Sequence, residues 1–355
     1  MRKSHPRTSI AWRCGLLLLL LAAALGAWSK DPALKNIRVE QGMLGASKIM
    51  IAVPKKWNRS VLIIAHGLVM ENMPLSADFS LEDACLQPLL QEGWMIASTS
   101  YRRNGYLHDE AIEDIDQLRQ HIITTYGAPE RVYLEGGSMG GAIVTKMAET
   151  HQGQYDGVLA VGAVLVINSL NYSFVPQMPL LFISNQNEMT DPKAYLAKGA
   201  NANAPLQPAV WQVKRDGHCN LNAKEELAAL RALFAWRETQ QIERDKDATI
   251  VLSPKSVARF HDGGVYAGIT EVSASYGNID TQFTADNLKQ LGITLGKRFT
   301  ATCNGKTVTV LYGTSYFDVP RGEWVAFIIA DGYLKIARHY ENAAAVFGCK
   351  AHDQI

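Results

Sequence analysis

One serine lies between glycines in a pattern that suits nucleophilic catalysis. Residues 132–141 form an apolar run that leads into Gly136-x-Ser138-x-Gly140, and a helix-forming run follows as far as Thr150. Glycine is needed there because a turn this tight brings the flanking positions against the neighbouring strand and helix. The turn would place the Ser138 hydroxyl at a helix N-terminus, where the helix dipole favours a developing oxyanion. The expected chemistry is attack on a carbonyl carbon.

His218 is the residue predicted to activate Ser138. A serine hydroxyl is a weak nucleophile until a base takes its proton. In strand–turn–helix sites of this kind the chain order is serine, acid, histidine. The first downstream loop histidine is His218, which follows Gly217 and precedes a predicted helix over about 223–236.

Two carboxylates compete for the role of the orienting acid. Both follow the predicted strand over residues 180–184. Glu188 has the customary spacing from the end of that strand. Asp191 is followed by Pro192, a pattern that also begins helices, with the aspartate as N-cap. We prefer Glu188 and keep Asp191 as the alternative.

Four more residues are candidates for the same site. The backbone N–H groups of Leu68, after an early apolar run, and of Met139, after the serine, are expected to form the oxyanion hole. Tyr101 and Arg102 follow the next apolar run. They are candidates for substrate binding, because ligands of open α/β sheets bind at the carboxyl ends of the strands.

Residues 37–236 resemble the α/β-hydrolase family, including its secreted esterases and prolyl-oligopeptidase-like members. The motifs that carry the resemblance are His66-Gly67, Ser100-Tyr101-Arg102, Gly-Gly-Ser138-Met-Gly-Gly and Gly217-His218. The resemblance implies an eight-stranded, mostly parallel sheet and acyl transfer through an acyl-serine. The chain departs from the family at Asn185, where a turn glycine is usual, and at Glu188, where aspartate is usual. Only about fifteen residues follow the strand after which relatives insert a lid, so we expect an open site within this domain.

The elements that must position these residues are visible as alternating patterns. Apolar runs without alternation are typical of strands buried on both faces of a sheet. An amphipathic repeat predicts a helix over 111–126, ended by Gly127. The strand candidates are residues 48–53, 61–65, 95–98, 132–135, 158–164 and 180–184. The fold class expected is α/β, a mostly parallel α/β-hydrolase sheet without a large lid, followed by a smaller β-rich, barrel-like domain.

The pattern changes after a polar, highly charged stretch at 238–247, interpreted as a linker or as the frayed end of a helix. Beyond it, short strand candidates at 301–303, 307–311 and 324–329 alternate with Asn-Gly and Asp-Gly turns. The predicted domains are therefore a signal peptide over 1–27, an α/β-hydrolase domain over 28–240 and a β-rich accessory domain over 241–355.

The second domain carries a resemblance of its own. Residues 268–281 and 332–348 resemble the C-terminal domain of S-adenosyl-L-methionine hydroxide adenosyltransferases. There an aromatic-Gly-Asn motif helps to hold a nucleoside, which implies Tyr276 and Asn278 here. The family's acid is replaced by Ser273 and its catalytic domain is absent, so a simple β-turn is favoured over a retained nucleoside site. That domain packs against a neighbouring subunit in the family, and a homo-oligomer through it is left open.

The N-terminus predicts export. Arg2, Lys3, Arg7 and Arg13 precede an apolar run of about fourteen residues that ends in small residues, as in signal peptides. The run is shorter than the roughly 18 residues that span a bilayer, so no stable membrane anchor is expected, an uncleaved anchor being the alternative. The predicted location is secreted or periplasmic.

Export bears on the cysteines, because an oxidising compartment favours disulfides. Four cysteines remain after Cys14 leaves with the signal. We predict a disulfide between Cys303 and Cys349 and, as the remaining pair, one between Cys85 and Cys219. Free buried thiols are the alternative.

Composition excludes several classes of protein. The chain has 35 basic and 34 acidic residues and is 47% hydrophobic, unlike disordered, collagen-like or nucleic-acid-binding chains. No metal motif or phosphate loop occurs, so neither metal nor cofactor is expected, and no nucleic acid as partner. The function predicted is a secreted serine hydrolase that cleaves small or polymeric carboxylic esters. The alternatives are a prolyl-oligopeptidase-like serine peptidase and a non-catalytic binding protein on a hydrolase scaffold. The second domain is expected to serve substrate recognition or assembly.

Overall fold

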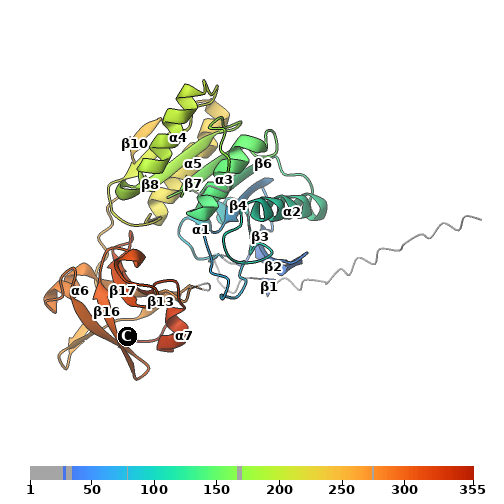
Figure 1. The fold of residues 1–355 in the computed structure, drawn as a ribbon. Coiled ribbons are helices and arrows are strands. Elements are labelled where there is room, and N and C mark those ends of the chain that lie inside the picture. The colour runs from blue at the N-terminus through green and yellow to red at the C-terminus, as the bar shows by residue number, and fades with distance from the viewer. Residues whose placement is uncertain (1–26, 29–33, 78, 166–169, 274–275) are drawn as a thin grey trace, which may run out of the picture.

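The computed structural model describes residues 27–28, 34–77, 79–165, 170–273 and 276–355 (Figure 1). The predicted signal peptide lies outside the described residues except for Ala27, the first residue of a short strand. Within the described part of the chain, no helix is both long and apolar enough to cross a membrane.

The first domain is built on a ten-stranded sheet that is parallel from β5 to β10. All six strands predicted for this region lie in it. The resemblance implied eight strands, and the sheet is larger. In spatial order the strands are β1 (Ala27–Trp28), β2 (Ile37–Leu44), β3 (Ser47–Pro54), β5 (Met95–Thr99), β4 (Ser60–Ala65), β6 (Arg131–Gly137), β7 (Gly157–Val161), β8 (Leu180–Asn185), β9 (Ala209–Val213) and β10 (Asp245–Asp247).

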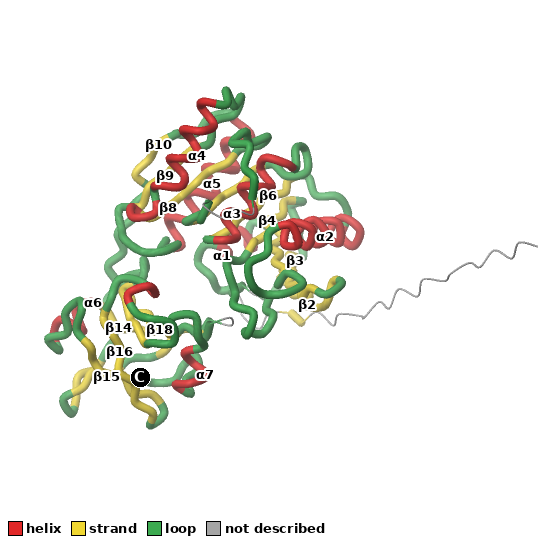
Figure 2. Tube along the Cα trace, in the orientation of Figure 1, coloured by secondary structure: helices red, strands yellow, loops and turns green. Residues whose placement is uncertain are grey.

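Helices cover both faces of this sheet, because the central strands are apolar on both sides. One face packs against α2 (Asp109–Tyr126), α3 (Met139–Thr150) and α4 (Thr190–Asn201), the other against α1 (Leu86–Gln91) and α5 (Ala223–Thr239). Figure 2 shows these helices flanking the strands. The predicted α/β class and the mostly parallel sheet are confirmed.

The first domain extends further along the chain than the predicted boundary at residue 240. Strand β10 pairs in parallel with β9, and the Ile250 N–H donates to the Glu225 carboxylate at 2.8 Å. The polar stretch interpreted as a linker therefore contains an edge strand. Edge pairing uses backbone groups, so polar side chains do not prevent it.

The second domain contains a curled six-stranded sheet, with β16 and β17 parallel and the other pairs antiparallel. In order, its strands are β13 (Ile269–Val272), β14 (Ile279–Thr284), β18 (Tyr333–Arg338), β17 (Trp324–Ile328), β16 (Lys306–Tyr312) and β15 (Arg298–Cys303). The short elements are β11 (Arg259–His261), β12 (Gly264–Tyr266), α6 (Ala285–Gln290), α7 (Ala343–Phe347) and the 3-10 turn η2 (Tyr316–Asp318). This confirms the predicted β-rich second domain.

Candidate active site

Ser138 lies at the junction of β6 and α3 in a left-handed backbone conformation, with φ of +57°. The glycines around it are required by close approach of the backbone. A β-carbon on Gly140 would lie 2.0 Å from the Ala65 carbonyl oxygen, and one on Gly136 would lie 2.4 Å from the Gly140 carbonyl oxygen. A strained non-glycine residue held in this way is typical of functional sites.

The structure brings the predicted serine, histidine and acid together. The Nε2 atom of His218 lies 2.8 Å from the Ser138 Oγ atom. On the other side of the ring, Nδ1 is hydrogen-bonded to the carboxylate of Glu188. The three side chains form one continuous chain, the arrangement in which a base can take the serine proton while a carboxylate holds its ring.

The alternative acid, Asp191, lies elsewhere. It is in the first turn of α4, and its Oδ2 atom accepts a hydrogen bond from the Leu165 N–H at 2.8 Å. Its carboxylate therefore ties the segment after β7 to α4 and does not bond to His218. Glu188 ends the 3-10 turn η1 (Gln186–Glu188) directly after β8.

Two asparagines hold the acid loop against the histidine loop. The Asn185 side chain donates to the Asn220 carbonyl oxygen at 3.1 Å and accepts from the Asn220 N–H at 2.7 Å. Asn187 makes the same two-way pair with Gly217, at 2.9 and 3.0 Å. Asn185 stands where the resemblance has a turn glycine, and the structure gives its side chain this bridging role.

The two predicted oxyanion-hole residues, Leu68 and Met139, both line the cavity beside Ser138. The loop before Leu68 packs tightly on the serine turn, since a β-carbon on Gly67 would lie 3.3 Å from that of Ser138. Met139 is the first residue of α3, so its N–H has no partner within the helix. Both residues thus border the cavity beside Ser138, where the predicted oxyanion hole requires their N–H groups.

Tyr101 and Arg102, which were predicted to bind substrate, do not line the cavity beside Ser138, because Tyr101 packs inside the domain and Arg102 pairs with α2. Tyr101 is fully buried (0% exposed), and its hydroxyl donates to the His66 carbonyl oxygen at 3.0 Å. Burial raises the pKa of this phenol, which stays a neutral donor. Arg102 forms ion pairs with Asp114 and Glu113 of α2, at 2.7 and 2.8 Å. These contacts brace the loop before Leu68 and the start of α2.

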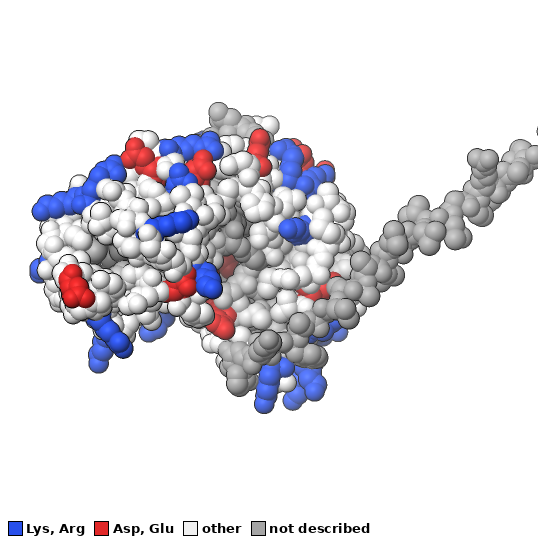
Figure 3. All heavy atoms as spheres, turned by 90° about the horizontal axis from the view of Figure 1, so that it is seen from below, with Lys and Arg blue, Asp and Glu red and all other residues white. Residues whose placement is uncertain are grey.

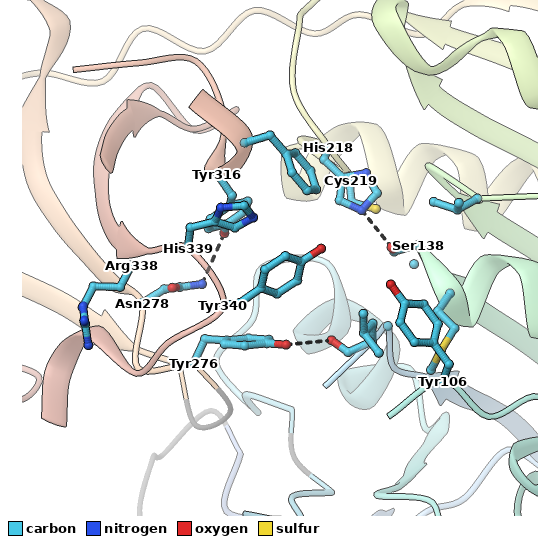
Figure 4. A pocket seen from close by; sticks show the side chains of 16 residues that line it. Tyr106, Ser138, His218, Cys219, Tyr276, Asn278, Tyr316, Arg338, His339 and Tyr340 are labelled. Atoms are coloured by element: carbon cyan, nitrogen blue, oxygen red, sulfur yellow. Dashed lines mark hydrogen bonds between the residues drawn. The ribbon is translucent and has the colours of Figure 1, made fainter. Parts of the chain in front are cut away.

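The cavity beside Ser138 has a volume of about 700 Å³ and lies between the two domains (Figure 4). The first domain contributes Ser138, His218, the two oxyanion-hole residues and Tyr106. From the second domain come Tyr276, Asn278, Tyr316, Phe317, His339 and Tyr340. The site expected to be open within its own domain is thus walled by the second domain.

Comparison with protein families agrees with this architecture. Residues 100–215 match the model described as serine aminopeptidase, S33, and residues 274–355 match that of the SAM hydroxide adenosyltransferase C-terminal domain. The first domain thus resembles the α/β-hydrolases in its mostly parallel sheet and in the segment that the first of these models matches.

Individual relatives of this chain are distant. The o-phthalyl amidase of Xanthobacter agilis is 29% identical over 130 residues, which are 35% of this chain and 27% of the amidase. The chain therefore spans about a quarter of the length of that relative. An esterase of Pyrococcus furiosus is 13% identical over 61% of this chain and 92% of its own, with a TM-score of 0.43. An uncharacterised protein of Thermotoga maritima is 21% identical over 36% of this chain and 48% of its own, with a TM-score of 0.27.

The motif residues Tyr276 and Asn278 face the hydrolase domain. The Tyr276 hydroxyl accepts from the Met70 N–H at 3.1 Å and donates to the Leu68 carbonyl oxygen at 3.2 Å. Asn278 donates to the Tyr316 hydroxyl at 3.3 Å. The turn between them needs Gly277, whose φ is +57° and whose β-carbon would lie 2.2 Å from the Asn342 side chain. The motif forms a turn, the alternative that was favoured over a nucleoside site. Its tyrosine also holds the loop over residues 66–70, which contains the predicted oxyanion-hole residue Leu68 and which we call the oxyanion loop.

The four cysteines of the described residues are free thiols, so neither predicted disulfide is formed in the structure. Cys219 donates to the Val161 carbonyl oxygen at 3.4 Å, which directs its sulfur to β7 and away from a bond with Cys85. Cys349 is hydrogen-bonded to Cys303 within the second domain. The bond between these two stays a prediction for an oxidising compartment. Burial raises the pKa of Cys85, Cys219 and Cys349, which makes them poor nucleophiles.

A buried carboxyl pair lies beneath the serine turn and was missed from the sequence. Glu135 is only 4% exposed, and its pKa is raised by burial and by neighbouring Glu226 of α5. The pKa of Glu226 is raised by its own burial. A glutamate in an otherwise apolar strand gave no signal that a second carboxylate faces it.

Among the described residues, no group of three or more potential ligands could hold a metal ion. On the face shown in Figure 3, basic and acidic side chains are interspersed.

The second domain was expected to serve substrate recognition or assembly, but none of its residues was predicted to line the serine site, and Tyr276 and Asn278 were named only for a nucleoside-like site. The aromatic pairs at 316–317 and 339–340 were the available signal. Nothing local indicates that these two turns face a serine some 180 to 200 residues earlier in the chain.

Proposed function

We propose that the protein is a serine hydrolase that cleaves carboxylic esters through an acyl-serine intermediate. The observation that carries the proposal is the hydrogen-bonded chain from Ser138 through His218 to Glu188 at a strained serine turn. An adjacent base and a third group that orients the base are the signature of an activated nucleophile.

Acylation begins with attack of the Ser138 Oγ atom on the ester carbonyl carbon. His218 takes the serine proton at Nε2, and Glu188 stabilises the imidazolium through Nδ1. The N–H groups of Leu68 and Met139 donate to the negative oxygen of the tetrahedral intermediate. When the intermediate collapses, the carbon–oxygen bond to the alcohol breaks, and His218 returns the proton to the leaving alcohol.

Deacylation repeats these steps with water as the nucleophile. His218 takes a proton from water while the water oxygen bonds to the acyl carbon. The bond to Ser138 then breaks, the acid leaves, and the proton returns to the serine oxygen.

Amide hydrolysis is the second candidate, favoured by the match to the serine aminopeptidase model and by the amidase relative. The same residues would protonate a leaving amine. An aminopeptidase also needs an anion for the substrate ammonium group. Among the described residues that line the cavity there is no carboxylate, which favours an ester or an uncharged amide. The complete serine–histidine–acid chain argues against a non-catalytic binding protein.

Labelling with a fluorophosphonate probe tests this function. Wild-type protein is expected to be labelled and Ser138→Ala unlabelled, while Ser253→Ala, a matched change at an exposed serine, keeps the label. A panel of p-nitrophenyl esters and aminoacyl amides then separates esterase from peptidase. Labelling that persists in Ser138→Ala contradicts the proposal.

We also propose that the protein is exported and that residues 1–27 are removed. Mature protein from the producing cells is expected to begin near residue 28 by N-terminal sequencing. A chain that begins at residue 1 or 2 in the cytosolic fraction contradicts export.

A further inference from the structure

The second domain presents an aromatic wall to the catalytic residues. We use this name for Tyr276, Tyr316, Phe317 and Tyr340, all of which line the cavity that contains Ser138. Figure 4 shows Tyr276 and Tyr340 reaching from the second domain towards the serine. The wall comes from three separate turns of that domain, so the fold itself collects these rings at one place.

Phe317 brings an apolar ring to the general base. Its ring centroid lies 6.2 Å from that of His218, in an edge-to-face arrangement at 65°. Phe317 is 59% exposed, although two rings of its own domain, those of His339 and Tyr340, also lie next to it. A large apolar side chain left uncovered beside a base offers surface that a bound ligand can bury.

Tyr340 lines the cavity with a strained backbone conformation. Its φ is +56°, in the left-handed region that bulky residues rarely adopt. Its ring stacks on that of His339 at 4.4 Å, which fixes its orientation. Among the described residues, the Tyr340 hydroxyl has no hydrogen-bond partner. Strain of this kind persists where the surrounding structure fixes a residue, and it clusters at ligand sites.

Tyr276 differs from Tyr340, because both hydrogen-bonding roles of its hydroxyl are used by the oxyanion loop. It therefore offers the cavity a ring and no free polar group. Tyr316 likewise accepts from Asn278 and packs edge-on against Phe327 at 4.9 Å. The wall is thus a set of aromatic surfaces in which, among its four described residues, only Tyr340 has a hydroxyl without a hydrogen bond.

We propose that the aromatic wall binds a planar aromatic ring of the ester substrate, next to the scissile carbonyl, and that Tyr340 and Phe317 determine this specificity. The inference rests on the proposed hydrolase function and adds a substrate class to it. Rings prefer offset or edge-to-face partners, which the wall supplies. An alkyl chain of equal size lacks that interaction and loses more rotational freedom on binding. A cavity of about 700 Å³ accommodates an aromatic acid esterified to a small alcohol.

Two matched esters measure the preference in full-length protein. Methyl benzoate and methyl hexanoate are compared by kcat/KM in a pH-stat, and phenyl acetate against hexyl acetate reports on the alcohol side. We expect the aromatic-to-aliphatic ratio to fall at least about tenfold in Tyr340→Ala and in Phe317→Ala. Tyr340→Phe keeps the ring and is expected to retain most of the ratio. Phe260→Ala, at an exposed aromatic residue of β11 that does not line the cavity, serves as the matched control.

The outcomes separate this inference from the hydrolase function. If the fluorophosphonate labels Ser138 and both esters are cleaved, but Tyr340→Ala and Phe317→Ala keep the wild-type ratio on both sides, the wall does not select aromatic rings. If the aromatic-to-aliphatic ratio falls as much in Tyr340→Phe as in Tyr340→Ala, recognition by the ring is also overturned. Thermal unfolding shows whether each variant is folded. If one of the two Ala variants is not folded, the ratio measured for the other tests the proposal.

Binding gives a test that does not need turnover. Calorimetric titration of Ser138→Ala protein with methyl benzoate and methyl hexanoate is expected to show preference for the benzoate. The added Tyr340→Ala change should remove that preference. If the wild-type chain is neither labelled nor active, the hydrolase proposal fails, and equal binding of the two esters then overturns the aromatic site as well.

Discussion

At the scale of single residues, the site depends on three side chains that act as one unit. Ser138 is pre-positioned by a strained turn, His218 bonds to it at 2.8 Å, and Glu188 fixes the ring from behind. In the proposed mechanism His218 takes the serine proton while Glu188 stabilises the ring, so removal of one member disables the others.

Ser138→Ala and His218→Ala are each expected to reduce kcat for an ester substrate by about 10³-fold or more. The double variant should be almost no slower than either single one, because the lost groups serve the same proton transfer. Steady-state kinetics with p-nitrophenyl butyrate measures this, and circular dichroism checks the fold. A Ser138→Ala protein with the wild-type rate would disprove the mechanism.

The two candidate acids predict different effects. Glu188→Gln should lower kcat by roughly 10³- to 10⁴-fold, because a neutral amide neither stabilises the imidazolium nor enforces the right tautomer. Asp191→Asn removes a charge that bonds only to the Leu165 amide, so kcat should change by no more than a few-fold. The reverse order of the two rates would reassign the acid to Asp191.

At the scale of the elements, two loops from different strands and one loop from the oxyanion side must meet at Ser138. Asn185 links the acid loop to the histidine loop, and Tyr276 links the second domain to the oxyanion loop. Catalytic rates are sensitive to such supports, because a displacement of about 1 Å costs up to about 10²-fold.

Asn185→Gly, which restores the glycine usual in the resembled family, removes two hydrogen bonds to Asn220. Asn185 is fully buried, so we expect a loss of about 1–3 kcal/mol in the free energy of unfolding and a lower kcat. Urea denaturation and ester kinetics measure the two effects. Asn203→Gly, the same change at an exposed asparagine, is the control. Equal behaviour of the two variants would show that Asn185 does not support the loops.

Tyr276→Phe tests the brace between the domains. It deletes the hydroxyl that bonds to Met70 and Leu68 while keeping the ring in the aromatic wall. We expect kcat to fall about tenfold with a smaller change in KM, because the oxyanion amides act mainly in the transition state. A change confined to KM would instead assign the hydroxyl to substrate binding.

At the scale of the whole molecule, carboxyl groups meet where the second domain approaches the underside of the hydrolase sheet. Asp331 of the second domain contributes to the raised pKa of Glu226, and its own pKa is raised by burial and by Asp280 and Asp83. The pKa of buried Glu135 is raised by burial and by Glu226. The folded protein therefore holds these protons more tightly than the unfolded chain.

This predicts a stability that declines towards alkaline pH. A raised folded pKa contributes stability that is fully present below the ordinary glutamate value, near 4.5, and is lost as pH rises through the folded value. Glu135→Gln cannot ionise, so it should be more stable than wild type at pH 8, by roughly 1–3 kcal/mol, and similar at pH 5. Urea midpoints across this range measure the effect, with exposed Glu82→Gln as the control. A Glu135→Gln protein whose stability parallels wild type at every pH contradicts the prediction.

Local sequence was sufficient for the parts of this protein that local sterics and periodicity dictate. The glycines around Ser138 predict a tight turn, because only glycine fits at those positions. Gly217-His218 follows Ser138 in the expected chain order. Continuous apolar runs predicted the buried strands, and a regular amphipathic repeat predicted α2, because each pattern reflects contacts made all along one element.

Other features depend on contacts between residues distant in the sequence. Tyr101 and Arg102 follow a strand at the correct edge, yet their side chains are directed by His66 and by α2 and so leave the cavity. The residues of β10 are polar, and only pairing with β9 makes them a strand. Tyr340 and Phe317 line the cavity beside Ser138 because the two domains meet there. The direction of a loop side chain and the docking of a domain are set by packing across the whole chain, and no local pattern encodes them.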